Sequence, residues 1–122
     1  MRTLVAATCF LVLAALFRSA PAYAGPPYAE GNPLQGRVLI GRFGCGACHL
    51  IPGISGADSD VGPPLTRIGR RIYVAGMLRN TPDNLAYWIQ HPQQVVPGNA
   101  MPDMGISRRQ AQDIAAYLLT LR

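Results

Sequence analysis

Apolar residues recur with helical spacing near the C-terminus of the chain. Between Ser107 and Arg122 they fall three or four positions apart, which places them on one face of a helix: Ala111, Ile114, Ala115, Leu118 and Leu121. Ser107 is a typical N-cap residue, because its hydroxyl can accept a hydrogen bond from a free backbone N–H of the first turn. The pattern predicts a helix over residues 107–122.

A second helix is predicted over residues 81–90. Thr81 can cap it, and Pro82 suits the first helical position because its missing N–H would be unpaired there in any case. Leu85, Trp88 and Ile89 form a stripe that we expect to be buried. Pro92 then ends the helix.

A third helix is predicted over residues 32–44, where four apolar side chains stand among good helix formers: Leu34, Val38, Ile40 and Phe43. Gly36 inside this stretch is costly for a helix. Such a glycine usually lets another backbone come close, although a frayed helix start is the simpler explanation.

The segments between these helices, residues 51–69 and 91–105, are rich in glycine and proline. Loops of that length in a small domain are normally functional or disordered. A cofactor at the centre would give both of them an apolar object to pack on. No stretch alternates like a sheet, so the predicted fold class is all-α.

The N-terminus has the composition of a secretory signal peptide. Arg2 precedes an apolar run from Thr3 to Phe17, and Ala22 and Ala24 form an A-x-A cleavage signature. An uncleaved membrane anchor is the alternative, but 15 apolar residues fall short of the roughly 20 that cross a bilayer. We therefore expect residues 1–24 to be removed and the protein to be periplasmic, with Cys9 a core residue of the signal.

Cleavage after Ala24 leaves residues 25–122 as one small domain, a size at which a cofactor, metal or disulfide often contributes to stability. Every basic residue is an arginine, and nine arginines against six acids give this part a formal charge of +3. That is far from the dense basic stripe of a nucleic-acid-binding protein.

The stretch GCGACHL, residues 44–50, carries the chemistry. A structural zinc site needs four ligands, and beyond Cys45, Cys48 and His49 the expected domain has only His91 and no further cysteine. A thioredoxin-like C-x-x-C follows a strand in a βαβ pattern, which is missing here. The remaining interpretation is C-x-x-C-H as a c-type haem attachment site, with thioethers at the cysteines and the imidazole on the iron.

From Gly36 to Leu121 the chain resembles a class I c-type cytochrome. The runs VGPPLTRIGRR and NTPDNLAYWIQHPQQVVPGNAMP make it similar to the cytochrome c domain fused to subunit II of bacterial haem-copper oxidases and to small periplasmic carriers. The resemblance implies a fold in which N- and C-terminal helices cross, at Gly36 and Tyr117, with a further helix and long loops around one covalent haem c and its iron.

The resemblance also implies roles for residues on the histidine side of the haem. Cys45 and Cys48 would form the thioethers, and His49 would be the proximal iron ligand. Pro63 would accept a hydrogen bond from the other ring nitrogen of that histidine, which orients it. Leu65 would line the same side. Arg70 is similar to an arginine that neutralises a haem propionate, with Arg71 as the competing candidate.

On the other side of the haem, Met101 matches the distal ligand, since the family carries it after a Pro-Gly loop. Met104 and then Met77 are alternatives, because methionine is more often core filler, and bis-histidine ligation through His91 is a further one. Trp88 stands where many relatives have a tyrosine near the methionine side.

The predicted function is one-electron transfer rather than catalysis, between a respiratory donor and a terminal oxidase or similar acceptor. A dehydrogenase or cytochrome complex is the other kind of partner, and membrane contact comes through such a complex alone. The alternative is a haem enzyme or gas-binding protein with an open distal site. Five arginines are expected near the haem rim, as steering charges or as plain solvating charge: Arg42, Arg67, Arg70, Arg71 and Arg79.

Overall fold

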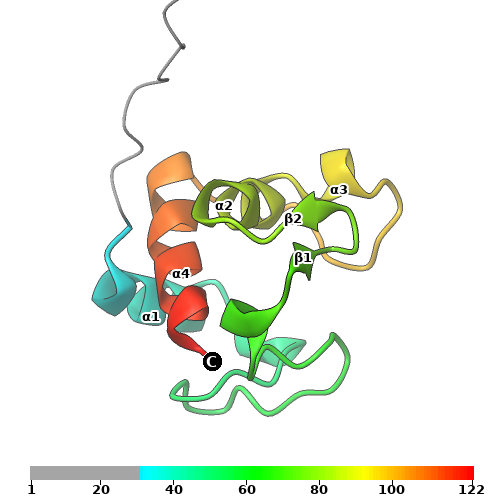
Figure 1. Cartoon of the computed structure of the whole chain (residues 1–122). Coiled ribbons are helices and arrows are strands. Elements are labelled where there is room, and N and C mark those ends of the chain that lie inside the picture. Colours follow the sequence, from blue (N-terminus) through cyan, green and yellow to red (C-terminus); the bar gives the residue numbers. More distant parts are fainter. Residues whose placement is uncertain (1–30) are drawn as a thin grey trace, which may run out of the picture.

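The computed structural model describes residues 31–122, so the predicted signal peptide lies outside the described residues. The element order is α1 (Pro33–Arg42), a 3₁₀ turn (Cys45–Ala47), a second 3₁₀ turn (Ile68–Arg70), β1 (Tyr73–Val74), β2 (Leu78–Arg79), α2 (Pro82–Gln90), α3 (Pro92–Val95) and α4 (Arg108–Thr120). Figure 1 shows these elements around the central helix α4. No helix in this part of the chain is long and apolar enough to cross a membrane.

The three predicted helices are confirmed, and side chains cap each of them. The Asn32 side chain accepts hydrogen bonds from the amides of Leu34 and Gln35 at the start of α1. Thr81 accepts from Asn84 at the start of α2. Ser107 and Gln110 form a capping box, in which each side chain bonds the other residue's backbone N–H. These caps satisfy the donors that a helix N-terminus leaves free.

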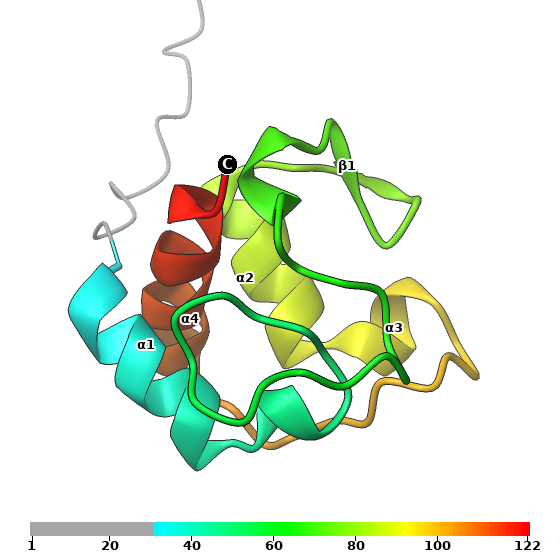
Figure 2. The ribbon, with the colours of Figure 1, turned by 90° about the horizontal axis from the view of Figure 1, so that it is seen from below.

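Helix α4 lies between α1 and α2, and it packs against both (Figures 1 and 2). The crossing of α1 and α4 is close because Gly36 has no side chain: a Cβ atom there would overlap the backbone carbonyl of Asp113. Tyr117 lies one helical turn further along α4, and its hydroxyl donates to the carbonyl of Pro52, 2.7 Å away. The predicted crossing is thus present, with the Asp113 backbone as the immediate neighbour of the glycine.

The four apolar side chains of the first helix do not share one buried face. Ile40 is fully buried and Phe43 packs against the core, but Leu34 and Val38 are 75% and 62% exposed. The buried face instead runs through Gly36, Leu39 and Ile40. The close approach at Gly36 decides which face of α1 meets α4, and this leaves the side chains of Leu34 and Val38 in solvent.

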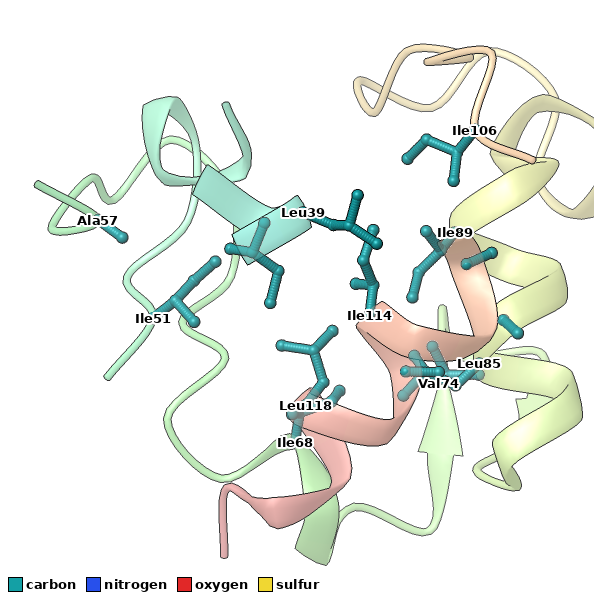
Figure 3. Packing of buried hydrophobic residues seen from close by; sticks show 14 residues of the cluster. Leu39, Ile51, Ala57, Ile68, Val74, Leu85, Ile89, Ile106, Ile114 and Leu118 are labelled. Atoms are coloured by element: carbon teal, nitrogen blue, oxygen red, sulfur yellow. The ribbon is translucent and has the colours of Figure 1, made fainter. Parts of the chain in front are cut away.

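The core lies where α1, α2 and α4 meet. Figure 3 shows Leu39 of α1, Ile114 and Leu118 of α4, and Leu85 and Ile89 of α2 converging there. Ile68 and Val74 close it from the loop side. Burial of these apolar side chains is the main stabilising term available to the polypeptide alone.

Two small features were not predicted from the sequence. Residues 73–79 form an antiparallel hairpin that pairs Tyr73 with Arg79 and Val74 with Leu78. Its turn places Ala75 at φ 54° and Gly76 at φ 68°, both in the left-handed region. A short helix, α3, begins at Pro92 directly after α2 ends. Both elements are too short to give a periodic signal in the sequence, and the fold remains predominantly helical.

Candidate haem site

The CGACH stretch forms a tight turn directly after α1. Gly44 takes a left-handed conformation, φ 69°, which suits a residue without a Cβ. The amides of Cys48 and His49 then both donate to the carbonyl of Cys45, at 3.3 and 3.0 Å. Cys45 and Cys48 are both free thiols, Cys45 half-buried and Cys48 exposed. The turn therefore presents two unpaired thiols and one imidazole close together.

These side chains line a cavity of about 480 Å³. A smaller cavity of about 100 Å³ adjoins it and shares four lining residues with it: Cys45, His49, Pro63 and Met101. We refer to the two cavities together as the crevice. Its remaining walls are largely apolar and come from the core face of the helices and from the 96–106 loop, with Ile40, Leu85, Ile89 and Ile106 among them.

His49 is held in one orientation by the loop that follows it. Its Nδ1 lies 2.8 Å from the carbonyl oxygen of Pro63. A carbonyl can only accept, so Nδ1 is the donor in this contact, and in the neutral ring the lone pair is then on Nε2. Gly62 makes this approach possible, because a Cβ atom there would lie 2.5 Å from Cε1 of the ring. The imidazole is therefore prepared to bind a metal through Nε2.

Burial raises the pKa of the Cys45 thiol above its usual value. A hydrogen bond involving its own backbone acts in the opposite direction, and the nearby Cys48 raises the pKa further. The cause is that a thiolate loses its hydration in an apolar wall. Cys45 thus faces the apolar interior of the crevice, where an organic group would be in contact with it.

The methionines differ in their relation to the crevice. Met101 lines both cavities, whereas Met104 lines the larger one alone. Met77 is 65% exposed on the hairpin and lines neither. His91 lies at the junction of α2 and α3, with its ring 5.0 Å from that of Tyr87, beside a separate surface groove. Of these candidates, Met101 is the one placed to reach a group in both parts of the crevice.

Arg71 lines the crevice, whereas Arg70, the residue that the resemblance implies would meet a propionate, does not line it. The 3₁₀ turn ends at Arg70, and Arg71 follows in extended backbone, φ −73° and ψ 143°. Arg71 Nη2 donates to the carbonyl of Pro64 at 2.6 Å. Both arginines are exposed, so what distinguishes Arg71 is that it also lines the smaller cavity.

Leu65 and Trp88 both line the smaller cavity. Leu65 is fixed by its amide, which donates to the carbonyl of Leu50 at 2.9 Å. Trp88 projects from α2 and is half-buried. Sequence reasoning missed Gln93 and Asn99, whose side chains hold the loop that carries Met101. The Pro-Gly-Asn turn signature was the available signal, since asparagine in a turn commonly bonds nearby backbone.

The donor set fits a covalently attached haem better than a bare metal ion. In residues 31–122 no three His, Cys, Asp or Glu side chains gather closely enough to hold an ion. The crevice instead offers two thiols, one oriented imidazole and the thioethers of Met101 and Met104 in a wide apolar space. Those are the groups that attach and ligate haem c.

Comparison with known proteins agrees with this chemistry. A family model described as cytochrome c matches residues 34–122. The chain is 36% identical over 89 residues to cytochrome c oxidase subunit 2 of Alkalihalophilus pseudofirmus, covering 72% of this chain and 25% of that protein. It is 35% identical over 104 residues to cytochrome c2 of Rhodopila globiformis, covering 75% of this chain and 95% of the relative. A cytochrome c2 of Agrobacterium tumefaciens is 33% identical over 106 residues.

The two kinds of relative differ in length. The chain spans about a quarter of the first oxidase subunit but nearly all of each cytochrome c2. The match of the family model over 34–122, together with the residues that line the crevice, implies covalently bound haem c and its iron. The chain belongs to the cytochrome c family, as a class I c-type cytochrome.

Proposed function

We propose that the protein is an exported one-electron carrier with a single haem c, attached through Cys45 and Cys48 and ligated by His49 and Met101. The observation that carries the proposal is that one apolar crevice is lined in both its parts by His49 and Met101, with the histidine already oriented by Pro63. Haem c, when bound, supplies an iron that changes oxidation state by one electron.

Each of these residues has a separate physical task. The Pro63 carbonyl holds the Nδ1 proton of His49 and so directs Nε2 toward the iron. Met101 offers a neutral thioether, which favours ferrous iron and raises the reduction potential. Arg71, which lines the crevice, would offset the negative charge of a propionate.

The residues that form the walls of the crevice support electron transfer rather than catalysis. On the side of Met101 they consist of Ile89, Ala100, Met104 and Ile106, with Asn99 as the polar neighbour. A peroxide-activating or gas-binding site needs a positioned acid–base or hydrogen-bonding group beside an open iron position. The apolar surroundings and the available thioether favour a filled position instead.

The proposed partners are redox proteins. The oxidase-subunit relatives support a terminal oxidase or similar acceptor, and the cytochrome c2 relatives support a separate small carrier that meets its donor in passing. The donor would be a dehydrogenase or cytochrome complex, and membrane contact would come through such a complex. Periplasmic location rests on the signal-peptide pattern of residues 1–24.

Two variants test the ligand assignment directly. Ferric wild-type protein should show the weak far-red sulfur-to-iron absorption band. Met101→Ala should abolish it and lower the midpoint potential by on the order of 0.1 V, within the roughly 0.8 V range that axial ligands span. Met104→Ala is the matched control and should keep both properties. The opposite pattern would transfer the role to Met104, and a wild type without the band would favour the open-site alternative.

A further inference from the structure

The loop that carries Met101 is held by two side-chain amides. Between residues of the 96–101 segment one backbone hydrogen bond is present, from the amide of Asn99 to the carbonyl of Val96 at 3.2 Å, and the amide of Val96 donates to the carbonyl of Pro92 at 3.0 Å. Gly98 adopts φ 77°, so the chain reverses sharply there. A loop with so little regular backbone bonding keeps its shape only if other groups bind its N–H and C=O groups.

Gln93 supplies three of these contacts from α3. Its Oε1 accepts from the amide of Gly98 at 3.1 Å, and its Nε2 donates to the carbonyls of Asn99 and Met101 at 3.0 and 2.8 Å. Both donor hydrogens of the side chain are therefore used. Replacing this amide would leave two loop carbonyls without their donor.

Asn99 completes the arrangement from within the loop. Its Nδ2 donates to the carbonyls of Pro92 and Val96 at 2.9 and 2.7 Å, and its Oδ1 accepts from the amide of Met101 at 2.8 Å. The backbone N–H of Met101 is thus held by one side-chain amide and its backbone carbonyl by another. Met101 is fixed on both sides before any bond from its sulfur to iron is considered.

We propose that Gln93 is a positioning residue that holds the Met101 loop closed over the crevice and so limits how readily another ligand replaces the methionine. The proposal rests on the proposed function, because it takes Met101 as the ligand. The physical reason is that the loop and the sulfur–iron bond are coupled: each hydrogen bond that stabilises the closed loop lowers the population in which the iron position is free.

Gln94, the next residue, provides a matched control. It has the same side chain on the same short helix, but it is exposed, and its Oε1 accepts from the hydroxyl of Tyr87 at 3.1 Å, away from the Met101 loop. A change at Gln94 therefore perturbs α3 without removing a donor or acceptor from the loop.

The experiment measures imidazole binding to the ferric holoprotein of wild type, Gln93→Leu and Gln94→Leu. The loss of the far-red absorption band is the signal that reports binding. Gln93→Leu should bind imidazole on the order of 30- to 150-fold more tightly, as expected for losing two or three hydrogen bonds from the closed state. Gln94→Leu should match wild type. Hydrogen exchange at the amides of Gly98 and Met101 should accelerate in the first variant alone.

If Gln93→Leu does not accumulate as holoprotein, the same imidazole titration is carried out on Gln93→Glu. It keeps the side-chain length and the acceptor for Gly98 while its ionised form loses both donors, so the same direction of change is expected. Equal imidazole affinity in wild type and the Gln93 variant would overturn the inference. A band that survives Met101→Ala would instead contradict the ligand assignment, so the two failures are distinguishable.

Discussion

The histidine side and the methionine side of the crevice are built differently. His49 belongs to a five-residue motif whose own turn positions it, and the Pro63 carbonyl and Gly62 confine its ring. Met101 belongs to an irregular loop held by the side chains of Gln93 and Asn99. The first side would also be tied to the haem through two thioethers, and the second through one coordinate bond.

This contrast indicates which side can open. Breaking the histidine side would require disrupting a tight turn, the hydrogen bond between His49 and Pro63 and the two proposed thioethers together. Opening the methionine side would require exchanging a few side-chain hydrogen bonds, each worth about 1 kcal/mol net, and breaking the one proposed bond from the Met101 thioether to iron. We therefore expect ligand exchange and local opening to begin at residues 96–101.

The largest expected effect comes from removing the covalent links. Cys45→Ala with Cys48→Ala should give protein that loses its haem to acidic organic solvent and is largely unfolded, because a group that binds the native state no longer contributes to its stability. Haem extraction and far-UV circular dichroism measure the two outcomes. In wild type the haem should stay with the polypeptide, and its extraction would contradict thioether attachment.

Two glycines, one on each side, sharpen the comparison. Gly62→Ala places a Cβ against the His49 ring, and overpacking of this kind costs roughly 1–3 kcal/mol. An added Cβ at Gly98 meets no atom within 4 Å, but the residue has φ 77°. Placing alanine in that left-handed conformation should lower the free energy of unfolding by about 1 kcal/mol. Denaturant unfolding of the holoproteins should show the larger loss for Gly62→Ala. Equal losses of unfolding free energy in the two variants would mean that the histidine side tolerates an added Cβ as well as the Met101 loop does.

A smaller effect is expected from the arginines beside the histidine loop. Arg71→Gln removes a positive charge from the crevice and the donor to Pro64, so the midpoint potential should fall by roughly a few tens of millivolts. Arg70→Gln is the neighbouring control and should leave the potential nearly unchanged. Potentiometric titration of both variants decides between the two arginines. A larger shift of the midpoint potential for Arg70→Gln would favour Arg70 as the residue that meets a propionate.

The smallest effect concerns the surface charges of the two sides. Residues 61–79 contain four arginines and no acid, whereas residues 80–106 contain two aspartates and no arginine. None of the four arginines pairs with a carboxylate within residues 31–122, where Arg109 with Asp113 forms the ion pair. We expect reduction of a soluble oxidase domain to slow as salt screens this field. Stopped-flow rates that stay constant or rise with ionic strength would show that the four arginines do not steer the encounter electrostatically.

Local sequence was sufficient for the parts of the molecule whose geometry depends on neighbours along the chain. The three helices follow from apolar spacing and from caps such as Thr81 and Ser107, because capping and helical periodicity act within a few residues. The cysteines and histidine of the attachment motif are equally local, since their spacing alone brings thiols and imidazole together.

Contacts between distant segments needed the fold. The apolar positions of α1 do not by themselves show which face is buried: α1 and α4 approach closely at Gly36, with Leu39 and Ile40 buried and Leu34 and Val38 exposed. Neighbouring arginines look alike in sequence, and the fold alone places Arg71 against the carbonyl of Pro64 and among the residues that line the crevice. The amides of Gln93 and Asn99 carry no periodic signal, because their partners are defined by how an irregular loop folds back on α3.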